Sequence, residues 1–415
     1  MDLEVVGRAG IWTVLFPDGI QVKFTQIHED EDGIKSEVSF KATQSQKQYL
    51  LTTRINLSSS RSRAAVANML NERFPLGKQN WLRIVEEACV AVQNSIRAPT
   101  PAVKLGEGEP RPLSFVLEPF IVEEEPNVIF GPSGAGKSYL ALLFGVLVAT
   151  GLDLTETLGL RAARTGNVVY VDWETSENEL RRRLQKLCKG LGLSPTDVPL
   201  WYVRAMQPLT GNEHIAEIIM DLDPVLVILD SMGLAAGGPL NDPHTAVSFY
   251  KGLRQLDVNT LVIAHTPKNN DESIFGSGYF TYLARSIWEL KASWEQDALF
   301  IGLFHRKFNM GRLESPHAFQ LVFGPDSTVT VSRVNVTDVP DLSTRVSLRT
   351  RILNLLKDTG EAMSVSDIAR TLGVEPNLVG AYLLRMAREG VVKNLRRGVY
   401  CVAEEKEKAE EVVPF

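Results

Sequence analysis

The residues whose types and spacing most clearly suggest chemistry form one loop, Gly131-Pro-Ser-Gly-Ala-Gly-Lys-Ser138. The loop matches the pattern G-x-x-x-x-G-K-[ST], in which glycines let the backbone curl and turn its N–H groups toward phosphate oxygens. A strand-like apolar run, Pro126 to Phe130, precedes it, and an apolar helical run from Tyr139 follows it. A glycine-bearing loop can match by chance, but this strand–loop–helix context is the one the pattern requires. We therefore predict a site for ATP and Mg²⁺.

The side chains of this loop predict separate contacts. Lys137 can reach the β- and γ-phosphates, and Ser138 can be a ligand of Mg²⁺. The start of the following helix adds positive potential at the same place. The predicted nucleotide-binding residues are Gly131, Pro132, Ser133, Gly134, Ala135, Gly136, Lys137, Ser138 and Tyr139.

Three later apolar runs end in polar side chains. Val168 to Val171 leads to Asp172-Trp173-Glu174, Val225 to Leu229 leads to Asp230, and Leu261 to Ala264 leads to His265. Parallel α/β sheets bind ligands at the carboxyl ends of their strands. Glu174 could therefore activate a water, and Asp230 could hold Mg²⁺ together with Ser138. His265 could sense the γ-phosphate. A simple strand-end carboxylate and a structural histidine are the alternatives for Glu174 and His265.

These positions need a scaffold, which we predict from hydrophobic patterning. Residues 113–334 alternate short apolar strands with helical patterns, as expected for an α/β domain with a parallel sheet. Residues 1–98 predict a small, β-rich α+β domain, with strands before about residue 57 and helices at 60–74 and 81–96. Residues 99–112 predict a Pro-rich linker, and residues 335–346 a second linker.

The C-terminal part predicts three helices and a hairpin over residues 347–403, followed by an acidic tail at 404–415. This pattern resembles a winged helix-turn-helix domain. Residues 345–401 hold ten Lys or Arg and five Asp or Glu, so this stretch carries a charge of +5. The candidates for DNA phosphate contacts are Arg385, Arg388, Lys393, Arg396 and Arg397. A winged helix that docks onto protein is the alternative.

Bulk properties narrow the function classes. The net charge is −6, so DNA contacts would come from local patches rather than from the whole molecule. The three cysteines, Cys89, Cys188 and Cys401, are far apart and predict no disulfide framework. The N-terminus lacks a signal-peptide pattern, and the most apolar stretch, Tyr139 to Thr150, is too short to cross a bilayer. We therefore expect a cytoplasmic protein without a membrane partner.

The core resembles the RecA-like ATPases, especially the ring-shaped replicative helicases of the RepA and DnaB type. The resemblance spans about residues 115–325 and rests on GPSGAGKS, VVYVDWE, VLVILDS, LVIAHTPK, FGSGYFTYLARSIWELK and HRKFNMGRLESPHAF. It implies an α/β fold with a RecA-like P-loop core, and it makes Glu174 rather than Asp172 the catalytic base. It also implies that loops 233–241 and 268–278 face a central channel, where Lys268 would contact single-stranded DNA.

The same resemblance implies a homo-oligomer, a hexamer in this group, in which a basic residue from one subunit reaches the nucleotide of the next. Arg306, Lys307 and Arg312 are the candidates, with a slight preference for Lys307, and a solvent-exposed basic hairpin is the alternative. The β-rich N-terminal domain and the extra C-terminal domain depart from the DnaB pattern.

Together these features predict an ATP-hydrolysing, oligomeric motor that acts on single-stranded DNA in a channel and on duplex DNA at the winged helix. A recombinase-like or regulatory DNA-binding ATPase that does not unwind is the alternative. An ATP-sensing scaffold is disfavoured, because Glu174 and Asp230 occur together.

Overall fold

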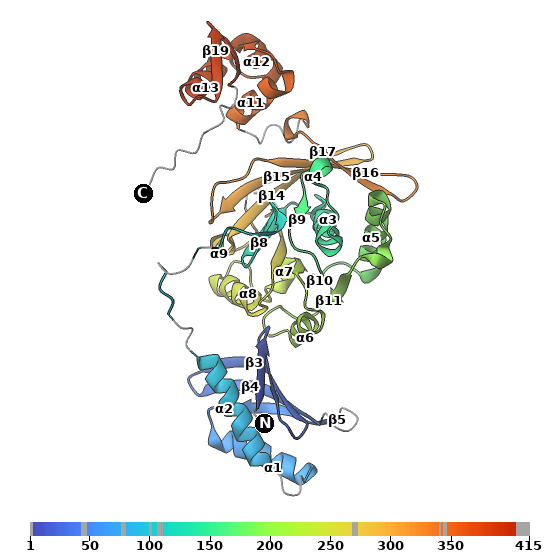
Figure 1. Cartoon of the computed structure of the whole chain (residues 1–415), viewed down its shortest axis with the longest axis vertical. Coiled ribbons are helices and arrows are strands. Elements are labelled where there is room, and N and C mark those ends of the chain that lie inside the picture. The colour runs from blue at the N-terminus through green and yellow to red at the C-terminus, as the bar shows by residue number, and fades with distance from the viewer. Residues whose placement is uncertain are drawn as a thin grey trace. The chain divides into compact units, whose positions relative to one another are not determined.

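The structure is a computed structural model that describes residues 3–42, 48–75, 80–98, 102–105, 109, 111–267, 273–339, 342 and 347–403. Among these residues, no helix is long and apolar enough to cross a membrane. The chain forms an N-terminal α+β domain, a large α/β domain and a C-terminal helical domain (Figure 1). This is the fold class that the sequence predicts.

The N-terminal domain is a five-stranded antiparallel meander in the order β1-β2-β3-β4-β5, with two helices on one face (Figure 1). Alternate strand residues such as Val22, Phe24 and Val38 are buried, and they pack with Trp81 and Ile84 of the second helix. The elements are β1 (Glu4–Arg8), β2 (Ile11–Leu15), β3 (Ile20–Asp30), β4 (Gly33–Ala42), β5 (Gln48–Asn56), α1 (Ser60–Arg73) and α2 (Trp81–Arg97).

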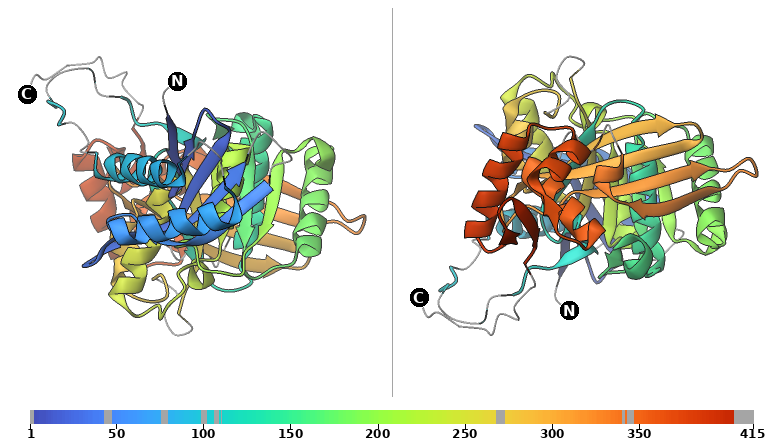
Figure 2. Two further views of the ribbon diagram at one scale, coloured as in Figure 1. Left: turned by 90° about the horizontal axis from the view of Figure 1, so that it is seen from below. Right: turned by 90° about the horizontal axis from the view of Figure 1, so that it is seen from above.

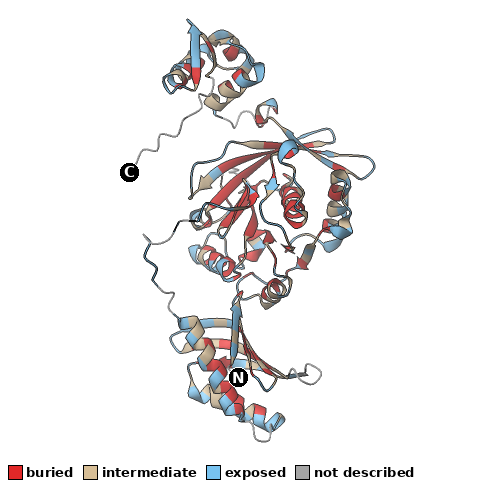
Figure 3. Ribbon diagram, viewed as in Figure 1, coloured by how far each residue is buried: buried red, intermediate tan, exposed pale blue. Residues whose placement is uncertain are grey.

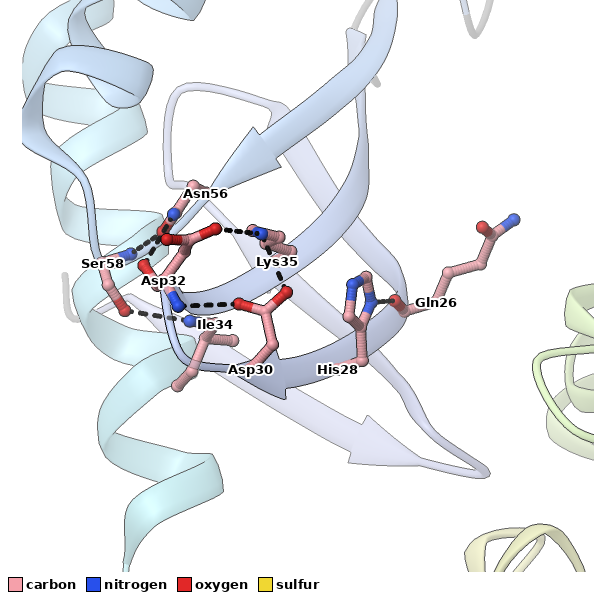
Figure 4. Close-up of polar contacts among 8 residues, drawn as sticks. All are labelled: Gln26, His28, Asp30, Asp32, Ile34, Lys35, Asn56 and Ser58. Atoms are coloured by element: carbon pink, nitrogen blue, oxygen red, sulfur yellow. Dashed lines mark hydrogen bonds and ion pairs between the residues drawn. The ribbon is translucent and has the colours of Figure 1, made fainter. Parts of the chain in front are cut away.

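The acidic turn between β3 and β4 is held by hydrogen bonds and ion pairs with residues of the same domain (Figure 4). Lys35 Nζ donates to Asp30 Oδ2 at 2.8 Å and to Asp32 Oδ2 at 3.0 Å. Asn56 Nδ2 donates to the Asp32 carbonyl at 3.0 Å. The hydrogen bond from Lys35 lowers the pKa of Asp30. This exposed run of acids therefore stabilises a turn.

The large α/β domain holds a nine-stranded sheet in the order β11-β10-β12-β13-β8-β14-β15-β16-β17. The first six strands in this order, β11-β10-β12-β13-β8-β14, are parallel to one another. Strands β15 and β16 pair with each other in antiparallel fashion. The strands are β8 (Pro126–Gly131), β10 (Val168–Asp172), β11 (Leu200–Arg204), β12 (Leu226–Asp230), β13 (Thr260–His265), β14 (Ser286–Glu295), β15 (Ala298–Phe308), β16 (His317–Phe323) and β17 (Val329–Val334).

Helices cover both faces of the parallel strands, which are buried between them (Figures 1 and 3). Gly145 of α3 packs directly on one face, since a Cβ there would lie 3.0 Å from the Ile228 and Leu200 side chains. On the other face, Val227 and Leu229 pack with Phe249 of α8 and Phe280 of α9. The helices are α3 (Lys137–Thr150), α4 (Thr155–Leu158), α5 (Glu177–Leu191), α6 (Glu213–Leu222), α7 (Met232–Ala235), α8 (Pro243–Gln255) and α9 (Gly278–Leu283).

Two smaller features complete this domain. A second sheet has the strand order β7-β6-β9, from β6 (Phe115–Glu118), β7 (Ile121–Val122) and β9 (Arg161–Ala162). The segment that we predicted as a second linker packs in part: Val336, Val339 and Leu342 are buried against Phe304 and Ala318. The described part of this segment therefore packs against β15 and β16 and is not an extended linker, because burying its apolar side chains is favourable.

The C-terminal domain gathers three helices and a β-hairpin around a small core (Figure 2). Val379, Leu383 and Met386 of the third helix pack there with Ile352 and Ile368. The elements are α11 (Leu348–Thr359), β18 (Met363–Ser364), α12 (Val365–Leu372), α13 (Pro376–Arg388), β19 (Val392–Arg396) and β20 (Val399–Val402), with the sheet order β18-β20-β19. Three helices and a two-stranded wing are present, as the sequence predicts.

Candidate active site

Glycines give the loop between β8 and α3 its shape. Gly134 and Gly136 have φ angles of 75° and 85°, in the left-handed region that favours glycine. A Cβ at Gly131 would lie 2.4 Å from the Leu290 carbonyl oxygen, so no side chain fits there. Helix α3 starts at Lys137, two residues before the predicted start. The loop is thus a concave backbone that ends at a helix N-terminus, which suits a phosphate.

Lys137 lies inside this loop. Its Nζ donates to the carbonyl oxygens of Gly131 at 2.8 Å and Pro132 at 2.6 Å. Burial lowers the pKa of Lys137 to about 8, although the carboxylates of Asp230 and Glu174 favour the charged form. The ammonium group is therefore preorganised against backbone oxygens that it could exchange for phosphate oxygens.

Asp230 and Ser138 meet at the tip of β12. Asp230 Oδ2 accepts hydrogen bonds from Ser138 Oγ at 2.7 Å and from the Tyr170 hydroxyl at 2.6 Å. Tyr170 is fully buried within β10, and it is not among the residues predicted from the sequence. The signal for it was a hydroxyl inside an otherwise apolar strand, because buried polar groups need a partner. Together, Ser138 and Asp230 form the oxygen pair expected of a Mg²⁺ site.

Glu174 and His265 come together from two strand tips. Glu174 Oε1 lies 3.5 Å from His265 Nε2 and accepts a hydrogen bond from the Ser231 hydroxyl. These bonds, led by that of His265, lower the pKa of Glu174 to about 2, against an opposing effect of burial. The side chain remains 41% exposed. Glu174 is thus an ionised carboxylate that solvent can reach.

Asp172 has a different place from Glu174. It is fully buried, and its Oδ1 accepts the backbone N–H groups of Glu174 and Thr175, each at 2.7 Å. Its Oδ2 is buried without a hydrogen-bond partner among the described residues. Burial raises the pKa of Asp172. Asp172 therefore shapes the turn that presents Glu174, rather than facing solvent itself.

The glycine cradle, the buried ammonium of Lys137 and the paired oxygens of Ser138 and Asp230 fit a nucleoside triphosphate with Mg²⁺. In the parallel register, Asp172 pairs with Asp230, and His265 pairs with Gly131. Neighbouring strands therefore end at one edge of the sheet, and the sequence-predicted residues of this edge are brought together. They are Lys137, Ser138, Glu174, Asp230 and His265.

The basic segment that begins at the end of β15 is held differently. Arg306 pairs with the buried carboxylate of Glu289, with its Nε 2.6 Å from Glu289 Oε2. Lys307 Nζ donates to three carbonyls at the end of α9, those of residues 281, 282 and 284, at 2.8–2.9 Å. Arg312 is exposed, and within the described part of the chain no hydrogen bond or ion pair holds it. Arg312 is thus the unengaged cation of the three.

The predicted DNA-binding residues divide into two groups. Lys268 lies outside the described residues. The other five, Arg385, Arg388, Lys393, Arg396 and Arg397, are exposed on α13 and the wing of the C-terminal domain. The guanidinium of Arg385 lies over the Tyr382 ring, 5.9 Å from its centroid.

Two family models match parts of the chain. Residues 93–271 match a family described as an AAA domain, and residues 347–393 match a family described as winged helix-turn-helix DNA-binding. Among solved structures, a KaiC-like protein from Pyrococcus horikoshii is similar over 52% of this chain and 93% of its own, with 16% identity and a TM-score of 0.37. The phosphate loop thus lies within the stretch that matches the AAA domain, and α11, α12 and α13 lie within the stretch that matches the winged helix-turn-helix family.

Proposed function

We propose that this protein is an ATP-hydrolysing, oligomeric motor that acts on DNA in the manner of replicative helicases. The observation that carries the proposal is the meeting of Glu174 and His265 beside Lys137 and the Ser138–Asp230 pair. A phosphate site that has its own ionised carboxylate supports hydrolysis, and not nucleotide binding alone.

Bound ATP and Mg²⁺ would supply the phosphoanhydride and neutralise part of its charge. Lys137 would exchange its loop carbonyls for the β- and γ-phosphate oxygens, and Ser138 and Asp230 would hold the metal. Glu174 would orient a water and accept its proton, while His265 and Ser231 fix the carboxylate. Tyr170 would orient Asp230.

A backbone connection supports the step from hydrolysis to movement. The N–H of Phe275 donates to the His265 carbonyl at 2.8 Å, and the N–H of Ser277 donates to the Leu240 carbonyl at 2.7 Å. Leu240 belongs to one of the two loops that we predict to face the channel, and Phe275 and Ser277 belong to the other. A shift of His265 against Glu174 on loss of the γ-phosphate would therefore move both loops.

The basic segment supplies the proposed contact between subunits. Arg306 and Lys307 are engaged within their own chain, so the exposed Arg312 is our first candidate for reaching the neighbour's nucleotide, with Lys307 second. A cation placed there stabilises charge on the phosphoryl oxygens in the transition state. The site would then be complete only in an oligomer, which we propose to be a cytoplasmic hexamer.

Mixed oligomers test this sharing. A Glu174→Gln subunit and an Arg312→Ala subunit should each be inactive alone but should partly regain ATP turnover when mixed. Some interfaces would then pair an intact Glu174 with an intact Arg312 from the neighbour. Turnover of reassembled mixtures, with mixed composition verified by native mass spectrometry, is the measurement.

The same mixture made with Lys307→Ala identifies which cation crosses the interface. Rescue with only one of the two variants assigns the role to that residue. A mixture of Glu174→Gln with Lys137→Ala is the control, because both residues act in one subunit's site and no activity should return. Failure of both test mixtures, with mixed oligomers present, would contradict a shared site.

We further propose that the winged helix domain binds duplex DNA. Deleting residues 347–415 should weaken duplex binding and flatten its salt dependence, by about 0.9 in the log–log slope for each phosphate that the domain neutralises. ATP turnover without DNA should survive, because the phosphate site lies outside the deletion. Binding titrations of the two proteins over a salt series measure the slopes, and identical slopes would point to a protein-docking role.

The winged helix also favours a second candidate function, a regulatory ATPase that binds duplex DNA without unwinding it. Strand displacement separates the two functions. A forked duplex with a single-stranded tail should be unwound by the intact chain with ATP, and Glu174→Gln should remove that activity. DNA-stimulated turnover without displacement on any fork would favour the regulatory function.

A further inference from the structure

The solvent face of helix α13 is well defined. Val379, Leu383 and Met386 are buried in the domain core, so helical periodicity leaves the opposite face to solvent. The six residues of that face are Asn377, Leu378, Ala381, Leu384, Arg385 and Arg388, all of them exposed. We call this set the α13 face.

The α13 face combines apolar and cationic side chains. Leu378 and Leu384 are 49% and 54% exposed, and Ala381 lies between them. Helix α13, PNLVGAYLLRMAR, contains no acidic residue. Exposed leucines on a cationic helix are suited to a polyanionic partner that also offers apolar groups.

We propose that the α13 face reads A·T base pairs in the major groove of duplex DNA. This inference rests on the proposed binding of duplex DNA and names the sequence class that is bound. Leu378, Ala381 and Leu384 would contact thymine methyl groups, and Asn377 would bind the N6 and N7 atoms of adenine. Thymine carries the one apolar group that base edges present in this groove.

The order of residues along α13 favours A·T over G·C pairs. In helix-turn-helix domains, the N-terminal residues of the second, recognition helix contact base edges. Here Asn377, Leu378 and Ala381 occupy that half, and Leu384 follows one turn after Ala381. Arg385 and Arg388, the side chains suited to guanine, lie in the last turns. The arginines and the exposed wing residues Arg396 and Arg397 are then available for phosphates.

The charge pattern favours DNA over a protein partner. By helical spacing, Leu384 lies beside Arg388, four residues on, and Leu378 lies on the same side of the helix as Arg385, about two turns away. Residues 345–401 carry a net charge of +5, which complements the phosphate backbone of DNA. On duplex DNA the same arrangement places leucines over bases and arginines over the backbone.

Base analogues test the inference in the intact 415-residue chain. Two duplexes of equal length are compared by fluorescence anisotropy at one salt concentration, one of mixed A·T sequence and one of mixed G·C sequence. The protein should bind the A·T duplex roughly tenfold tighter. Replacing thymine by uracil removes only the methyl group, and it should weaken binding several-fold.

Protein variants test the same contacts from the protein side. Leu378→Ala with Leu384→Ala should bind thymine and uracil duplexes equally, and Asn377→Ala should no longer distinguish adenine from 7-deazaadenine. Leu395→Ala is the matched control, because Leu395 is also 54% exposed but lies on β19. That variant should keep the full effect of uracil. Arg396→Ala with Arg397→Ala should weaken binding to all duplexes alike and lower the salt slope.

The outcomes distinguish this inference from the proposed function. Duplex binding that is indifferent to uracil, both in the intact protein and in the leucine variants, would overturn base reading while leaving DNA binding intact. A preference for A·T that survives uracil would also overturn it, because groove shape would then be the cause. A change in oligomer mass in the leucine variants, with unchanged duplex affinity, would assign the leucines to contacts between copies. Absence of any duplex binding would contradict the proposed DNA contact itself.

Discussion

Replacing Glu174 with glutamine should leave ATP bound while lowering turnover by about 10²–10⁴-fold, the usual contribution of a general base. The carboxylate is ionised and open to solvent, and it is held by His265 and Ser231. An amide of the same shape keeps the packing but cannot accept a proton from water. Single-turnover hydrolysis, with ATP affinity measured separately, resolves the two effects.

Asp172→Asn is the matched control for that experiment. The asparagine oxygen can still accept the backbone N–H groups of Glu174 and Thr175, so the turn should persist. We expect a much smaller loss of turnover. Normal turnover in Glu174→Gln, together with a large loss in Asp172→Asn, would show that the base is Asp172.

Replacing Lys137 with alanine should abolish tight ATP binding. The substitution removes the buried ammonium that faces the β- and γ-phosphates and leaves the carbonyls of Gly131 and Pro132 in its place. Calorimetric titration with ATP measures the loss. Lys251→Ala, at an exposed position on α8, should bind ATP normally. Unchanged affinity in Lys137→Ala would contradict the phosphate site.

The pH dependence of the intact protein checks the same residue independently. Burial lowers the pKa of Lys137 to about 8, so in the free protein the ammonium loses its proton as pH rises through that value. Phosphates bind the charged form, and ATP affinity should therefore fall as pH rises past 8. Lys137→Ala should lack this dependence. An affinity that stays constant through that range in the intact protein would contradict the assignment.

Much of the fold could be predicted because its signals are local. The apolar runs that became β8, β10, β12 and β13 are short, are bounded by turns and end in polar residues. Strand β11 was not predicted, since it lies at a sheet edge and its residues alternate weakly between buried and exposed. Edge strands bury less, so the hydrophobic period that reveals a strand is weaker in them.

Individual residues of the site could be predicted, but the hydrogen bonds between them could not. The loop sequence and the strand tips pointed to Lys137, Glu174 and Asp230. The hydrogen bonds from Tyr170 to Asp230 and from Ser231 to Glu174 join residues about sixty positions apart. Such pairings depend on strand order and register, which a single sequence does not reveal.

The hydrogen bond between Ser277 and Leu240 has a mechanical consequence. Gly276 has a φ angle of 114°, and a Cβ there would lie 2.6 Å from the Leu240 carbonyl oxygen, so the two loops meet without room for a side chain. Two loops joined at this point are expected to move together and not independently. In the motor proposed above, each subunit would therefore contact DNA through two loops that act as a single unit.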